Sequence, residues 1–159
     1  MTYPQSFVID ALVQYAIPLQ IDNSQPARQT LLHRLRHIWT PDCRVLNHNG
    51  EELYRWEGYL PPAEFAPRML FGFGIAYLRE KRYDNAEKLF EDVLRRFSTA
   101  IAAPEAQYYL GVARYRRDPE SDEMLEQWAQ LRARYPGSEA RVKQSFKELP
   151  EPAKRSSSA

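Results

Sequence analysis

A spaced pattern of small and large residues limits how the second half of this chain can fold. Gly74 and Gly111 lie 37 residues apart, and each directly follows a large apolar residue. A small residue that recurs at a fixed spacing lets two antiparallel helices approach closely, while the larger residues fill the seam between them. The first copy of the pattern consists of Leu70, Phe73, Gly74, Tyr77, Ala86 and Phe90. The pattern therefore predicts helical hairpins that repeat along the chain.

Four helices are predicted in this half of the chain. Two of them span about residues 62–98 and divide near residues 81–83, and two more span about residues 104–135 and divide near residues 117–119. The second copy of the pattern is less regular than the first, because it needs one residue inserted after Gly111. Its matching residues are Leu110, Gly111, Tyr115, Met124, Trp128 and Pro136.

These residues resemble the tetratricopeptide repeat, in which W-x2-L-G-x2-Y is followed by A-x3-F and then by proline. Ser98 stands where the first copy would have its proline. In this family the first helix of each repeat lines an inner groove, so the resemblance implies a set of groove positions. They are Arg68, Phe71, Ile75, Leu78 and Arg79, then Glu105, Tyr108, Val112, Tyr115 and Arg116. Since about three repeats are usually needed for stability, this face either binds a partner peptide or packs on the first half of the chain.

The first half has a mixed pattern of helices and strands. Residues 6–15 show helical spacing, and Ile17–Asp22 alternates apolar and other residues, which predicts a short strand. Ser24 is expected to cap a second helix, with an apolar face formed by Leu31, Leu32, Leu35 and Ile38. The segments Asp42–Leu46 and Leu53–Trp56 flank an Asn-Gly turn, which predicts a β-hairpin.

The order of these elements resembles a thioredoxin-like domain that begins after its active site. The resemblance rests on Trp39-Thr40-Pro41 before the hairpin and on Gly58-Tyr59-Leu60-Pro61-Pro62 after it. The resemblance implies a cis peptide bond before Pro41. The whole chain is also similar to bacterial proteins in which such a fold runs directly into tetratricopeptide-like helices. The first strand of that family, and the Cys-x-x-Cys pair that ends it, have no counterpart here. Dithiol catalysis by this sequence is therefore chemically unavailable.

The strand that the resemblance lacks would lie between Ile17–Asp22 and Asp42–Leu46. Its absence would leave unpaired backbone groups on both flanking strands, which costs about 1–3 kcal/mol for each buried group. We therefore expect one of two arrangements. Either Ile17–Ile21 pairs directly with Cys43–Leu46, or a strand from another chain fills the position, most simply in a homodimer.

Composition argues against several other classes of function. The 22 Lys and Arg residues nearly balance the 21 Asp and Glu residues, so no overall charge favours nucleic acid. No apolar run approaches the roughly 20 residues of a membrane span, and we expect a cytoplasmic protein. Cys43 is the single cysteine and is expected to be a small buried apolar residue. His33, His37 and His48 have no metal-ligand spacing and are expected to be solvated, so neither metal nor cofactor is predicted.

The sequence as a whole predicts an α+β chain with three regions. Residues 1–66 are interpreted as a truncated thioredoxin-like α/β sandwich, residues 67–149 as tetratricopeptide-like helical hairpins, and residues 150–159 as a disordered tail. The preferred function is a noncatalytic adaptor that binds a protein or peptide. The alternative is a fragment of a thiol-disulfide oxidoreductase whose Cys-x-x-Cys lies upstream of Met1. The candidate partner-binding residues are Thr40, Pro41, Arg68, Phe71, Arg79, Tyr108, Tyr115 and Arg116.

Overall fold

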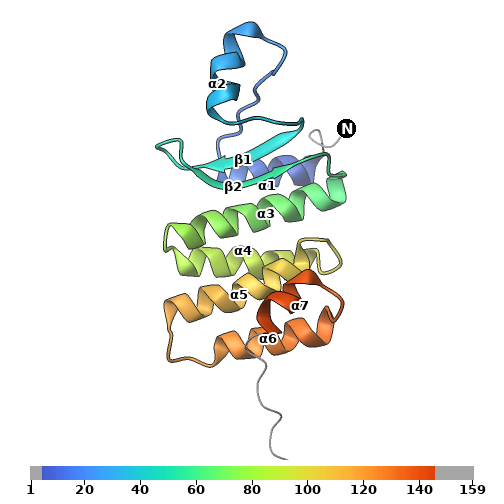
Figure 1. Cartoon of the computed structure of the whole chain (residues 1–159). Helices are drawn as coiled ribbons and strands as arrows, with labels where there is room; N and C mark the ends of the chain where they lie inside the picture. Colours follow the sequence, from blue (N-terminus) through green and yellow to red (C-terminus); the bar gives the residue numbers. More distant parts are fainter. Residues whose placement is uncertain (1–4, 146–159) are drawn as a thin grey trace, which may run out of the picture.

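A computed structural model describes residues 5–145, in which a small sheet is followed by a stack of helices (Figure 1). The first elements are α1 (Ser6–Tyr15), η1 (Pro26–Arg28), α2 (Gln29–Arg34), β1 (Asp42–Leu46) and β2 (Glu52–Glu57). They are followed by α3 (Pro62–Arg79), α4 (Tyr83–Arg96), α5 (Ala103–Arg117), α6 (Glu123–Arg134) and α7 (Glu139–Gln144). The mixed α+β class expected from the sequence is confirmed, with an antiparallel two-stranded sheet and helical hairpins. The tail predicted at residues 150–159 lies outside the described residues.

The predicted β-hairpin forms around Asn47 and Gly50. The side-chain oxygen of Asn47 accepts hydrogen bonds from the backbone N–H of Asn49 and of Glu51, at 3.0 and 2.9 Å. Gly50 has a φ of +78°, a conformation that side chains disfavour. This local turn chemistry fixes the register, in which Cys43 lies opposite Trp56 and the pairing is irregular between Val45 and Leu46.

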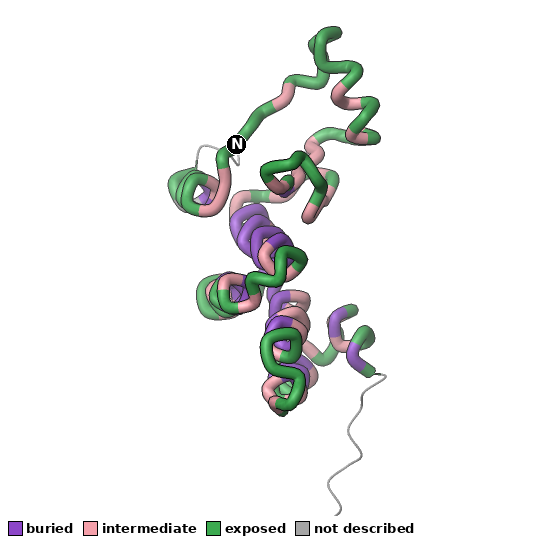
Figure 2. Tube along the Cα trace, turned by 90° about the vertical axis from the view of Figure 1, so that its left-hand side faces the viewer, coloured by how far each residue is buried: buried purple, intermediate pink, exposed green. Residues whose placement is uncertain are grey.

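Helices α3 to α6 form two antiparallel pairs that match the predicted hairpins. Gly74 of α3 lies so close to α4 that a Cβ atom there would be 2.5 Å from the ring of Phe90. A Cβ atom at Gly111 of α5 would likewise be 2.9 Å from Trp128 of α6. Ala86 is fully buried in the first of these seams. Small residues therefore set the close approach of both helix pairs, and most of the buried residues lie on α3, α4 and α5 (Figure 2).

The strand predicted at Ile17–Asp22 is absent, so this prediction was wrong. The segment carries no strand and has no strand partner among the described residues, and Ile17 and Leu19 are 95% and 82% exposed. An alternating pattern becomes a strand only when a neighbouring edge accepts its hydrogen bonds, and β1 pairs here with β2 alone. Direct pairing of Ile17–Ile21 with Cys43–Leu46 is therefore also wrong.

The second helix is shorter than predicted, and Ser24 does not cap it. The Ser24 hydroxyl and backbone N–H both donate to the carboxylate of Asp22, at 2.7 and 2.9 Å, so this serine belongs to a turn before η1. Helix α2 ends at Arg34, and Arg36 follows in the left-handed conformation with a φ of +51°. Ile38 consequently lies beyond the helix and is exposed, and α2 contains no buried residue.

Helix α7 was not predicted. Ser138 caps its N-terminus, because the serine hydroxyl accepts a hydrogen bond from the N–H of Arg141 at 3.2 Å. The helix packs against α5 and α6, where Ala140 and Gln144 are buried. Gln144 accepts a hydrogen bond from Arg132 of α6 at 2.9 Å, which ties this short helix to the end of the stack.

Candidate partner-binding groove

A groove of about 390 Å³ lies where β2 meets the first helix of each hairpin. Its volume is within the range of pockets that hold small ligands. The lining residues come from β2, from the following loop, from α3 and from α5. They are Tyr54, Arg55, Trp56, Glu57, Leu60, Arg68, Phe71, Ile75, Arg79, Glu105 and Tyr109.

Arg68 joins the three elements of the groove. Its guanidinium donates to the hydroxyl of Tyr54 on β2 at 3.3 Å and to the carboxylate of Glu105 on α5 at 3.0 Å. Burial acts to lower the pKa of Arg68, but the hydrogen bond to Tyr54 and the charge of Glu105 outweigh it and raise the pKa. Burial also raises the pKa of Tyr54, and the bond from Arg68 opposes this only in part. Arg68 therefore stays charged and holds β2 against the helices.

An aromatic cluster centred on Phe71 forms the floor of the groove. The Phe71 ring lies 5.6 Å from that of Tyr54, 5.7 Å from that of Tyr109 and 5.8 Å from that of Phe90. The Tyr54 contact is edge-to-face, a geometry that aromatic quadrupoles favour. Trp56 also lines the groove, and its buried indole N–H has no acceptor among the described residues. The floor is thus apolar, and the unpaired indole N–H is itself buried beneath it.

The charged side chains that line the groove form ion pairs with one another, except for one arginine. Arg55 pairs with Glu57, and Arg68 pairs with Glu105. Arg79 at the end of α3 is exposed and has no ion pair or hydrogen bond with any described residue. The groove therefore offers Arg79 as a free positive charge to an incoming anionic group.

The structure brings together only part of the predicted partner-binding set. Arg68, Phe71 and Arg79 line the groove with the other implied positions Ile75 and Glu105. The remaining helical candidates, Tyr108, Tyr115 and Arg116, do not line it. Tyr108 instead stacks on Trp128 with ring centroids 5.1 Å apart. Tyr109 and the whole contribution of β2 were not predicted, because only tertiary packing brings them to the groove.

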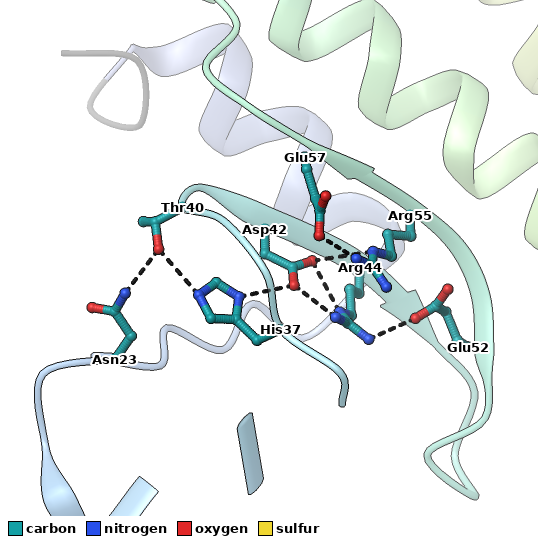
Figure 3. A network of polar contacts seen from close by, with 8 residues as sticks. All are labelled: Asn23, His37, Thr40, Asp42, Arg44, Glu52, Arg55 and Glu57. Atoms are coloured by element: carbon teal, nitrogen blue, oxygen red, sulfur yellow. Dashed lines mark hydrogen bonds and ion pairs between the residues drawn. The ribbon is translucent and has the colours of Figure 1, made fainter. Parts of the chain in front are cut away.

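The other two candidates, Thr40 and Pro41, do not line the groove. Thr40 belongs to a polar network at the sheet (Figure 3). The Thr40–Pro41 peptide bond is cis, as the resemblance implied. The Thr40 hydroxyl accepts from the Asn23 amide at 2.8 Å and hydrogen-bonds to the His37 ring at 3.3 Å. Its polar side chain is therefore already engaged within the chain.

Asp42 is the centre of that network. Arg44 donates to its two carboxylate oxygens at 2.9 and 2.6 Å, and the ring of His37 lies 3.1 Å away (Figure 3). Burial acts to raise the pKa of Asp42, but the hydrogen bonds from Arg44 and His37 and the charges of Arg44 and Arg55 lower it overall. His37 was expected to be solvated, and that expectation was wrong, because its side chain is only 17% exposed and bonded on both nitrogens.

The helices that line the groove lie in segments that match a known protein family. A family model, described as tetratricopeptide repeat, matches residues 69–100 and 105–138. Residues 69–138 contain tetratricopeptide repeats. The matched segments run from α3 into the turn after α4, and from α5 into the turn after α6, so each repeat is one helical hairpin. No curated protein matches the chain. The first helices of the two repeats, α3 and α5, are the ones that supply the helical wall of the groove.

The described part of the chain offers no candidate metal site, and its cysteine is half-buried. No group of three or more His, Cys, Asp or Glu residues there could hold a metal ion. Cys43 is half-buried and packs beside the core. Within residues 5–145, none of the helices combines the length and the apolar character needed to cross a lipid bilayer.

Proposed function

We propose that this chain is a noncatalytic adaptor that binds a segment of another protein in the groove between β2, α3 and α5. Tetratricopeptide repeats typically bind protein partners through the first helix of each repeat. The observation that carries the proposal is the charge balance of the groove, in which two internal ion pairs leave Arg79 free above an aromatic floor. Aromatic residues and arginine are the residue types most enriched where proteins bind one another.

Capture from a native lysate with matched charge variants tests the proposal. Arg79→Glu reverses the free charge of the groove, and Lys88→Glu makes the same change on the exposed face of α4, away from the groove. Proteins that bind the unaltered chain and the Lys88→Glu variant, but not Arg79→Glu, are the expected result. An identical set of captured proteins for all three chains would contradict the proposal.

We further propose that residues 1–66 are a truncated thioredoxin-like domain joined to repeats in residues 67–149. The β-hairpin of β1 and β2, with the helix α1 before it, supports this interpretation. The missing strand at Ile17–Asp22 weighs against it.

Reduction of insulin by dithiothreitol, followed by turbidity, tests the noncatalytic assignment, because a rate well above the protein-free control would contradict it.

A further inference from the structure

The outer edge of β2 offers backbone hydrogen-bonding groups that the described residues leave unused. The N–H of Gly58 donates to the carbonyl of Pro41 at 2.9 Å. From this pair onward, hydrogen-bonded and non-hydrogen-bonded residue pairs alternate along the hairpin. Trp56 and Tyr54 therefore direct their backbone groups toward β1, while Arg55 and Glu57 direct theirs away from it. Because β1 is the only described strand that pairs with β2, the N–H and C=O of Arg55 and Glu57 have no backbone partner there.

This unpaired edge faces the groove. Four consecutive residues of β2, from Tyr54 to Glu57, line the groove together with residues of α3 and α5. Successive side chains of a strand point to opposite faces of the sheet, so a groove lined by four in a row must run along the strand edge. No residue of β1 contributes to the lining, which shows that the edge in question is the outer one.

The groove therefore combines a strand edge, an apolar floor and one free cation. We propose that a partner peptide binds there in an extended conformation, as an added β-strand on β2, with an acidic side chain of the peptide paired to Arg79. This inference rests on the proposed function and specifies its ligand. An added strand satisfies the backbone groups of Arg55 and Glu57 and places alternate side chains on the floor. A helical peptide bonds its own backbone internally and would leave that edge unpaired.

Proline substitution at Glu57 tests strand addition with little change to the sheet. Proline removes the N–H of Glu57, which points away from β1, so the bonds between β1 and β2 remain and proline is tolerated at such an edge. Glu57→Ala removes the same side chain, including its ion pair with Arg55, but keeps the N–H. The pair of variants isolates a single backbone donor, and thermal melts establish that both remain folded.

The probe is a phage-displayed library of random short peptides, selected on the complete, unaltered chain. We expect the selected peptides to contain an acidic residue and alternating apolar residues. Binding of a synthetic peptide from this set should weaken about tenfold in Glu57→Pro relative to Glu57→Ala. Only every second N–H of an added strand faces β2. N-methylation of the peptide residues whose N–H faces β2 should therefore abolish binding, whereas N-methylation of the residues between them should not.

Three outcomes would overturn the inference. Equal affinity of Glu57→Pro and Glu57→Ala, with binding still lost in Arg79→Glu, would show a groove ligand that does not add a strand and would leave the proposed function standing. If the selected peptides bound Arg79→Glu and the unaltered chain with equal affinity, this would contradict both the pairing of an acidic residue with Arg79 and binding in the groove. A library that yields no binder would exclude short extended peptides as ligands, whereas the lysate capture would still test the groove with folded partners.

Discussion

Gly74 is the residue on which the first helix pair depends most directly. The space that a side chain would need is filled by the ring of Phe90, so Gly74→Leu must push α3 and α4 apart. We expect the free energy of unfolding to fall by about 1–3 kcal/mol, the usual effect of overpacking a close contact. Thermal melting followed by circular dichroism measures this loss.

Gly137 supplies the matched control for that substitution. It lies in a turn, and a Cβ atom added there would have no other atom within 4 Å, so Gly137→Leu should leave the melting temperature nearly unchanged. If the two variants melted at the same temperature, Gly74 would not be a point of close helix approach.

Asp42 gives a prediction for the acid side of the stability profile. Its lowered pKa in the folded state means that the unfolded chain binds a proton more readily as the pH falls. The contribution of Asp42 is therefore complete above the pKa of the unfolded carboxyl, near 4, and is lost as the pH falls through the lower folded pKa. Asp42→Asn should destabilise the chain by about 1–3 kcal/mol at neutral pH, with a smaller difference in strong acid.

Denaturant unfolding at a series of pH values checks this prediction. Glu52→Gln is the control, since it removes a more exposed carboxylate from the same Arg44 and should cost less than 1 kcal/mol. A difference between the unaltered chain and Asp42→Asn that stayed constant from neutral to acid pH would show that the Asp42 carboxyl does not titrate in the predicted way.

At the scale of elements, local chemistry decides which parts the sequence can predict. The hairpin needs only an Asn-Gly turn between two apolar runs, and α3 to α6 need only helical spacing and small residues at their seams, so all were predicted correctly. Ile17–Asp22 has an equally clear alternating pattern, but that pattern does not say whether the segment lies alongside a strand edge. Here it does not, and the outer edge of β1 has no strand partner among the described residues. Helix α7 has six residues, too few for an apolar period to show.

The exposed apolar residues of the segment before η1 lead to a prediction about assembly. With direct pairing excluded, the remaining expectation is that a strand from a second copy pairs with the open edge of β1 and covers Ile17 and Leu19. Light scattering after size-exclusion chromatography should therefore show a dimer. Replacement of both Ile17 and Leu19 by Lys should shift the population toward monomer.

Ile101 and Val142 provide the control for the assembly experiment. They are 64% and 65% exposed on other parts of the molecule, so replacing both by Lys adds the same charge without touching the sheet edge. A monomer in the unaltered chain, or an equal loss of dimer in both double variants, would exclude this mode of assembly.

At the scale of the whole molecule, the sequence predicted the part of the groove that α3 forms, but not the groove itself. Arg68, Phe71 and Arg79 follow from the register of the repeat, whereas Tyr108, Tyr115 and Arg116, which the same register predicts on α5, do not line the groove. The contributions of Tyr54 and Trp56 depend on how the sheet packs on α3, a contact between elements with unrelated patterns. No local signal in the sequence encodes that packing.

The layered arrangement predicts a gradient of local stability. Successive helices from α3 to α6 pack chiefly on their neighbours in sequence, and the buried residues concentrate in the middle of the stack. Amide hydrogen exchange, corrected by the intrinsic rates of the unfolded chain, should be at least about tenfold slower in α3 to α5 than in η1, α2 and α7. Equal protection throughout would mean that the chain opens only as one cooperative unit.

Helix α3 is unbroken from the sheet to the turn before α4. Its 18 residues, about 27 Å long, cover the inner face of the sheet at one end and form the first helix of the repeats along the rest. Because this one helix packs against β2 and against α5, it supports both walls of the groove, so we expect a ligand to meet a surface that is already assembled. The rate of capture should therefore be set by diffusion and orientation, with no slow closing step, and little conformational entropy should be lost by the receptor.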